Sequence, residues 1–150
     1  MQRAKIRRVS KEVITMIEKT CAIIKPHAVQ ERGTTGAIIE LIERNGFEII
    51  ALKKVHFTEK EAQDFYEIHK ERPFFGELVD NMIAGPAVVM ALSKDNAIQE
   101  WRDLMGATNP EKAAVGTMRK MFGKNISYNA THGSDAPETA RRELKQLFQL

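Results

Sequence analysis

The stretch of this sequence with the richest chemistry is Asn129–Asp135, which reads Asn-Ala-Thr-His-Gly-Ser-Asp. The imidazole of His132 is nucleophilic when neutral, and an unperturbed histidine, with a pKa of about 6.5, is largely neutral at physiological pH. Gly133 gives the neighbouring backbone conformational freedom. We interpret His132 as a candidate nucleophile that forms a covalent phosphohistidine. A loop whose histidine is merely exposed is the alternative, because short motifs match many unrelated sequences.

The residues after this motif predict a helix that could orient the imidazole. Pro137 suits the first turn of a helix, and Ser134 or Asp135 could cap its start. Glu143 would then lie two turns along the helix, where its carboxylate can fold back toward the ring of His132.

The elements that must position these groups follow from hydrophobic periodicity and turn residues. Strands are expected at residues 20–24, 47–57, 87–92 and 129–131, and helices at 37–44, 58–69, 76–84, 96–105 and 137–148. Thr58 and Glu61 have the spacing of a capping box. Two β-α-β halves with extra helices indicate an α+β fold. We expect a ferredoxin-like sandwich with a four-stranded antiparallel sheet, helices packed on it, and an added helical hairpin and loop.

The composition is that of one globular domain. The chain has 150 residues, of which 43% are hydrophobic and 29% charged. Its net charge of +3 fits a polyanionic ligand and nucleic acid equally well, so it does not separate the two. Cys21 is the only cysteine, which excludes an intramolecular disulfide and favours a reducing compartment. No apolar run approaches the roughly 20 residues of a membrane span, and the first ten residues lack the apolar core of a signal peptide. We therefore expect a cytoplasmic protein with no membrane association.

Residues 1–18 are set apart as a basic N-terminal extension, with a single domain expected at 19–150. Apolar residues between Val9 and Ile17 recur at helical spacing, so a short amphipathic helix and a frayed tail both remain open. A module that binds single-stranded nucleic acid is a competing hypothesis for the function. The aliphatic strands argue against it, because such sheets display paired aromatic residues, and Phe74 instead falls in a helical hairpin.

The motifs together resemble those of the nucleoside diphosphate kinase family, from about Thr20 to Phe148. The family signature around the catalytic histidine, Asn-x-x-His-Gly-Ser-Asp, is present unchanged at 129–135. Five further landmarks follow in the family's order: Ile24–Pro26, Lys70–Phe75, Gly85–Pro86, Gly106–Pro110 and Gly116–Arg119. Six such motifs in one order make a chance match very improbable.

The resemblance implies transfer of the terminal phosphate from a nucleoside triphosphate to a nucleoside diphosphate, by a ping-pong mechanism through phospho-His132. It implies that Glu143 and Ser134 orient the ring and that Tyr66 lies near the reacting phosphate. It also implies Mg²⁺ as cofactor, with Asp135 close to the metal-bound phosphates. Relatives of this kind form a homotetramer or homohexamer built from dimers.

The resemblance further implies how the nucleotide is held. The phosphates would be bound by Lys25, Arg102, Thr108 and Arg119. The base would lie between Phe74 and Ile126, with Leu78 below it. Asn129 would contact the ribose, and Lys25 would contact the ribose hydroxyl next to the one that Asn129 contacts. Three cations from separate elements suit phosphate oxygens, and stacking on a phenyl ring accepts any base.

The sequence departs from the family pattern after Arg119, where Lys120 and Met121 replace the usual Gly-Asp. In the family these two residues ordinarily shape the loop around the arginine, so we expect the surroundings of Arg119 to differ from the family pattern. Ala130 and Thr131 also replace a common apolar pair. An inactive relative that serves as a scaffold is therefore a third hypothesis.

Several other residues in these motifs are interpreted as structural. Arg72 is expected to be an ion-pair partner, and Phe75 a core aromatic. His27, His56 and His69 show no shared metal-ligand spacing and are expected at the surface or the edge of the core.

Overall fold

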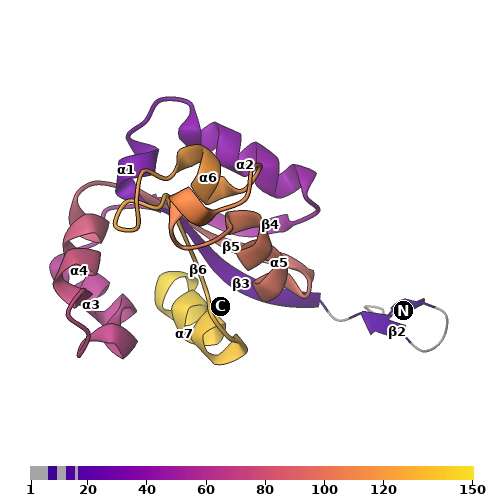
Figure 1. The fold of residues 1–150 in the computed structure, drawn as a ribbon. Coiled ribbons are helices and arrows are strands. Elements are labelled where there is room, and N and C mark those ends of the chain that lie inside the picture. The colour runs from indigo at the N-terminus through magenta and orange to yellow at the C-terminus, as the bar shows by residue number, and fades with distance from the viewer. Residues whose placement is uncertain (1–6, 10–12, 16) are drawn as a thin grey trace.

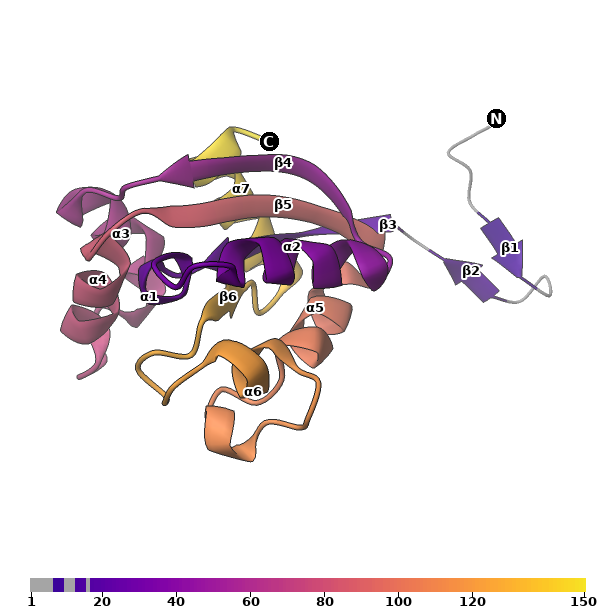
Figure 2. The same cartoon turned by 90° about the horizontal axis from the view of Figure 1, so that it is seen from above.

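The computed structural model describes residues 7–9, 13–15 and 17–150. Its centre is an antiparallel sheet in the order β4-β5-β3-β6 (Figures 1 and 2). These strands comprise Ile17–Ile24 (β3), Glu48–Val55 (β4), Ala87–Asp95 (β5) and Thr131–Gly133 (β6). The topology confirms the predicted ferredoxin-like fold.

Helices cover both faces of the sheet and bury a core on each. One core lies against Pro26–Val29 (α1), Thr34–Arg44 (α2), Ala97–Met105 (α5) and Met118–Phe122 (α6). The other lies against Glu59–Phe65 (α3), Phe75–Ile83 (α4) and Pro137–Phe148 (α7). Short 3₁₀ helices comprise Glu67–His69 (η1) and Pro110–Lys112 (η2).

Because successive residues of a strand point to opposite faces, a sheet covered on both sides needs apolar residues at every position. On β3, Ala22 and Ile24 belong to the first core, whereas Cys21 and Ile23 belong to the second. This explains why residues 20–24 and 87–92 read as uninterrupted apolar runs. The predicted capping box is also confirmed: the hydroxyl of Thr58 accepts from the N–H of Glu61, whose carboxylate accepts from the N–H of Thr58.

The strand expected at 129–131 is wrong in its bounds. β6 begins at Thr131 and places His132 opposite Ile23 of β3. Ala130 has a φ of 75°, and the N–H of Thr131 donates to the carbonyl of Asn129 at 2.9 Å. The chain therefore makes a tight turn at Ala130, and sheet pairing cannot begin before it.

The expected cap of the last helix is also wrong. The N-cap of α7 is Ala136, whose N–H donates to the hydroxyl of Thr139 at 3.0 Å. Ser134 and Asp135 do not cap it because their side chains bond to other groups of the site. Pro137 occupies the first turn, as predicted.

The helix considered for the N-terminal extension is wrong for the residues that the structure describes there. Arg7–Val9 (β1) pairs antiparallel with Val13–Thr15 (β2). An apolar spacing of four residues, such as that from Val9 to Val13, suits a helical face and paired strands equally well. Within the described ranges, no helix has the length and apolar character needed to cross a bilayer.

Candidate active site

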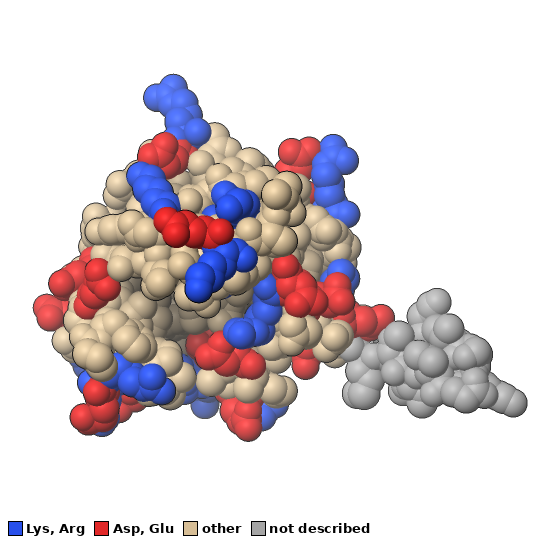
Figure 3. All heavy atoms as spheres, in the orientation of Figure 1, with Lys and Arg blue, Asp and Glu red and all other residues tan. Residues whose placement is uncertain are grey.

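A cavity of about 220 Å³ opens between the end of α3, η1 and α4 on one side and α5 and α6 on the other. Figure 3 shows a hollow on this face of the molecule with basic side chains along its edge. Nine of the predicted site residues line the cavity: Lys25, Tyr66, Phe74, Leu78, Arg102, Thr108, Arg119, His132 and Asp135. The structure thus brings together groups that the sequence spreads over more than a hundred positions.

The ring of His132 is anchored from behind by a buried carboxylate. Its Nε2 lies 3.1 Å from Oε1 of Glu143, and the hydroxyl of Ser134 donates to the same oxygen at 2.7 Å. Ser134 is itself held, because its oxygen accepts from the N–H of Cys21 on β3 at 3.2 Å. The indole N–H of Trp101 donates to the carbonyl of His132 at 3.2 Å. Side chain and backbone of the histidine are therefore both tied to fixed elements.

The carboxylate of Glu143 remains ionised in this setting. Burial by itself would raise its pKa, but the His132 ring and the Ser134 hydroxyl, with Arg142 further away, together hold the pKa below its ordinary value. An ionised carboxylate only accepts hydrogen bonds, so Nε2 of His132 donates. In the neutral ring the other nitrogen, Nδ1, then keeps the lone pair.

Aromatic residues pack around this imidazole. Its ring centroid lies 5.0 Å from that of Phe65 and 6.2 Å from that of Tyr66, both in edge-on geometry. Burial, followed by the nearby Glu143 and Cys21, raises the pKa of the Tyr66 phenol, which therefore stays protonated. Phe65 is a contact of His132 that the sequence analysis missed.

Lys25 enters the cavity from the end of β3 and is only 9% exposed. Its Nζ donates to Oδ1 of Asn129 at 2.9 Å. Burial, then the charge of Arg119, lowers the pKa of Lys25 to about 8. Asn129 is buried behind the lysine, and its amide reaches the carbonyl of Thr108 at 3.4 Å.

Arg119 is well anchored in spite of the altered residues after it. Its guanidinium donates to the carbonyls of Gly106 and Thr131, each at 3.0 Å. It is carried by α6, whose N-cap Thr117 accepts from the N–H of Lys120 at 3.4 Å. Lys120 thus extends the helix that holds the arginine.

Arg102 and Asp135 pair across the mouth of the cavity, with 2.7 Å between Nη1 and Oδ1. Both side chains are largely solvent-exposed, so the pair is weak and can exchange partners. Among the described residues, no cluster of three or more His, Cys, Asp or Glu side chains could hold a metal ion. A single exposed carboxylate fits an ion that is bound mainly by substrate phosphates.

The outer end of the cavity is apolar and aromatic. The ring of Phe74 is 40% exposed, and the His69 ring lies 5.8 Å from it. Arg72 makes no ion pair within the described part of the chain and instead lies 6.0 Å over the Phe74 ring, which corrects its predicted role. Ile126 is exposed on the loop before β6 and does not line the cavity.

Four lining residues were missed by the sequence analysis: His69, Met105, Thr131 and Gly133. His69 could have been found, because it follows Tyr66 by three residues, a spacing that keeps two side chains on one helical face. Gly133 is needed for packing, since an added Cβ would lie 2.6 Å from atoms of both Trp101 and Met105.

Comparison with known proteins shows the family to which the chain belongs. The family described as nucleoside diphosphate kinase matches residues 18–150. The chain belongs to the nucleoside diphosphate kinase family. The nucleoside diphosphate kinase of Rhodopseudomonas palustris strain BisB5 is 57% identical over 88% of this chain and 94% of its own length. That of Trichlorobacter lovleyi is 55% identical over 88% and 95%.

Solved structures of nucleoside diphosphate kinases also match. The Aquifex aeolicus enzyme is 41% identical and superposes with a TM-score of 0.86 over 89% of this chain and 96% of its own. The halophilic enzyme from Halobacterium salinarum, solved in complex with CDP, is 34% identical with a TM-score of 0.84 over 90% of each chain. The sequence and the structure therefore match the same family and the same fold.

Proposed function

We propose that this chain transfers the terminal phosphate of a nucleoside triphosphate to a nucleoside diphosphate, through a phosphohistidine at His132. The observation that carries the proposal is the pairing of Nε2 with buried Glu143 at 3.1 Å, which leaves Nδ1 as the nucleophilic nitrogen. A cavity edged by three cations surrounds the same ring. The CDP bound to the Halobacterium salinarum relative supports a nucleotide as ligand.

The reaction divides into two matched half-reactions. In the first, Nδ1 attacks the γ-phosphorus, so that an N–P bond forms while the bond to the leaving diphosphate oxygen breaks. In the second, a terminal oxygen of another nucleoside diphosphate attacks the same phosphorus and releases the imidazole. As charge moves on the ring, Glu143 and Ser134 keep its orientation fixed.

The cations near His132 would balance the charge of the transferred group. Lys25, Arg102 and Arg119 would hold the phosphate oxygens together with Thr108, because phosphoryl transfer is catalysed mainly by positioning and electrostatics. Arg102 would release Asp135 to do so. Tyr66, protonated and facing the cavity, would donate to a phosphate oxygen near the nucleophile.

The base and ribose would occupy the outer end of the cavity. Phe74 offers an exposed ring face for stacking, with Leu78 beside it. Ile126 would cover the other side of the base if its loop closes over it. Asn129 and Lys25, already hydrogen-bonded to each other, would contact the ribose hydroxyls. Stacking without recognition of the base edge would accept purines and pyrimidines alike.

Mg²⁺ would enter with the nucleotide phosphates, with Asp135 as the protein carboxylate beside it. When bound, the ion supplies positive charge that neutralises phosphate oxygens and orients them. The remaining positioning is done by residues of the chain itself.

We also propose a homotetramer or homohexamer built from dimers that pair through β4. This strand is the edge of the sheet, and Ile50 and Leu52 on it are 39% and 46% exposed. Exposed apolar residues on a free strand edge favour pairing with a second copy. The free thiol of buried Cys21 suits the reducing cytoplasm. The extension at 1–18 and the domain at 19–150 remain our proposed division.

The proposed function is tested by incubating the chain with γ-labelled ATP and then denaturing it. We expect an acid-labile, alkali-stable label on His132 that is lost when a nucleoside diphosphate is added. The variant His132→Ala should lose both label and turnover, whereas His56→Ala should keep them. A label that persists in His132→Ala would refute the proposal.

A further inference from the structure

The backbone two residues before His132 is strained. Ala130 is fully buried and has a φ of 75°, a region that residues with a Cβ seldom adopt. It lies at the centre of an i to i+2 hydrogen bond, from the N–H of Thr131 to the carbonyl of Asn129 at 2.9 Å. This combination is a γ-turn of the rarer form. Such strain persists only where the surrounding structure holds it in place.

Both backbone groups of Ala130 are held by one short segment of the chain. Its carbonyl accepts from the N–H of Lys25 at 2.8 Å, and its N–H donates to Nε2 of His27 at 2.9 Å. Lys25 has a place in the cavity, whereas His27 lies behind the turn and does not line it. Because His27 does not reach the cavity, any effect that it has on the site must pass through its hydrogen bond with Ala130.

We propose that His27 is a positioning residue, a hydrogen-bond acceptor that holds the turn at Ala130 and so sets the position of His132. The inference rests on the proposed function, because the consequence is the rate at which His132 takes up phosphate. The imidazole side chain of His27 reaches across 103 positions of sequence to make this contact.

The turn that His27 holds connects two residues that bind cationic side chains of the cavity. On one side is Asn129, whose Oδ1 accepts from Lys25. On the other is Thr131, whose carbonyl accepts from Arg119 at 3.0 Å. A relaxed turn would displace the nucleophile and these two anchors together.

The contact defines the protonation state of the His27 ring. A backbone N–H can only donate, so Nε2 carries no proton and the ring proton is on Nδ1. Burial, followed by the charges of Lys25 and Lys124 and opposed by that of Glu31, lowers the pKa of His27 to about 4. The ring of Tyr128 packs edge-on at 5.3 Å. The imidazole is thus a neutral acceptor throughout the physiological pH range.

A double-mutant cycle tests this role through the single-turnover rate of phosphorylation of His132. His27→Leu removes the acceptor, His27→Gln keeps one near the position of Nε2, and Ala130→Gly relieves the strain that the acceptor opposes. Since small displacements of a nucleophile cost large factors in rate, we expect His27→Leu to slow the reaction about tenfold or more and His27→Gln less than about threefold. In the Ala130→Gly background, His27→Leu should cost less than about threefold.

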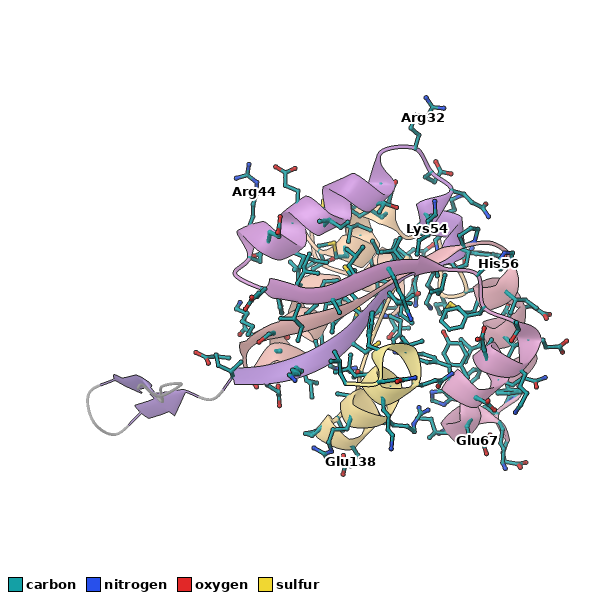
Figure 4. All side chains as sticks on the ribbon, turned by 180° about the vertical axis from the view of Figure 1, so that it is seen from behind. Arg32, Arg44, Lys54, His56, Glu67 and Glu138 are labelled. Carbon is teal, nitrogen blue, oxygen red and sulfur yellow. The ribbon has the colours of Figure 1, made fainter. Side chains whose placement is uncertain are left out.

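The matched control is His56→Leu. His56 lies at the end of β4 (Figure 4), and its Nε2 contacts the carbonyl of Ile83 at 3.0 Å, away from His132. Its substitution should leave the rate unchanged. An equal loss from His27→Leu in both backgrounds, no loss at all, or a glutamine variant as slow as the leucine variant would overturn the proposal.

A second measurement needs no variant. In ¹⁵N-labelled wild-type chain, the histidine ring nitrogens should show Nδ1 of His27 protonated and Nε2 bare at neutral pH. A protonated Nε2 would refute the role of His27 even where the leucine variant fails to fold. A wild-type chain that takes no phosphate at His132 would refute the proposed function instead, and the tautomer would still be measurable.

Discussion

The two ring nitrogens of His132 have different surroundings, and this difference is the basis of the proposed chemistry. Nε2 faces an ionised carboxylate that also accepts from Ser134, so the ring can neither rotate nor exchange tautomers freely. In the proposed reaction the same arrangement would stabilise the positive charge that the imidazole gains as it bonds to phosphorus. We therefore expect the reactivity of His132 to depend on Glu143 as well as on the ring itself.

Replacing the carboxylate tests this dependence. Glu143→Gln keeps the shape of the side chain but removes its charge, so we expect phosphorylation of His132 to slow by about 10- to 100-fold, as when a partner that orients a functional histidine is lost. Glu138→Gln, an exposed glutamate on the same helix (Figure 4), is the control and should be silent. The measurement is the single-turnover rate. Equal rates for both variants would contradict the role of Glu143.

The pKa of Lys25 predicts a pH dependence. Because burial and then Arg119 lower this pKa to about 8, the free protein loses the charge as pH rises through that value, and kcat/KM should fall there. The unfolded lysine keeps its proton up to about pH 10.4, so the same shift makes the free energy of unfolding rise with pH across this interval. Lys25→Arg retains its charge and should lose the fall in kcat/KM near pH 8. A wild-type kcat/KM that is flat from pH 7 to 9 would contradict the prediction.

The groups of the site were predictable to different degrees. The type and setting of His132 indicated a candidate nucleophile, whereas the roles expected of Lys25 and Arg102 followed from the resemblance to the family. Phe65 and His69 contact the site through packing that only the folded chain creates. The contacts that anchor Arg119 could not be predicted either, because its partners are backbone carbonyls, which have no signal in the side-chain sequence.

At the scale of elements, long apolar runs and caps were predictable and short irregular segments were not. The strand at Ala87–Asp95 and the helix at Pro137–Phe148 follow from apolar pattern and from Pro137. The start of β6 depends on the positive φ of Ala130, which an alanine does not signal. The backbone of Ala130 is held in this conformation by hydrogen bonds with Lys25 and His27, which are more than 100 positions away in sequence.

Because β6 packs tightly against α5, we expect a methyl group added at Gly133 to destabilise the fold. In Gly133→Ala the new Cβ would lie 2.6 Å from atoms of Trp101 and Met105 and disturb the bond from Trp101 to His132. We expect a loss of about 1–3 kcal/mol in the free energy of unfolding, measured by urea denaturation.

The matched control for this substitution is Gly76→Ala. Gly76 lies in α4 with no atom within 4 Å of the added Cβ, so the change should stabilise the chain by about 0.5–1 kcal/mol. Equal effects of the two substitutions would show that the contact at Gly133 is not tight.

At the scale of the whole molecule, the outer edge of β4 has no neighbouring strand, among the residues that the structure describes, to pair with its backbone N–H and carbonyl groups. The pairing of β4 with β5 skips a residue between Ile49 and Ala51, so Ile50 bulges from the ladder, and Leu52 is exposed further along. An edge with exposed apolar side chains fits the proposed dimer better than it fits an isolated chain.

Substitution at this edge tests the assembly. We expect Leu52→Glu to shift the sedimentation coefficient of the chain toward that of the monomer, because a charge buried in an interface without a partner is costly. The unfolding temperature should fall as well and lose its dependence on protein concentration. Ile68→Glu, at an exposed isoleucine on η1, is the control. An unchanged sedimentation coefficient for Leu52→Glu would exclude β4 from the interface.

The most direct test of the account identifies the nitrogen that receives the phosphate. The chain is labelled with ¹⁵N-histidine, phosphorylated with ATP and observed by ¹⁵N and ³¹P nuclear magnetic resonance. With Nε2 of His132 occupied by Glu143, phosphorus should couple to Nδ1 of that residue alone. Coupling to Nε2, or phosphate on any other side chain, would contradict the central claim.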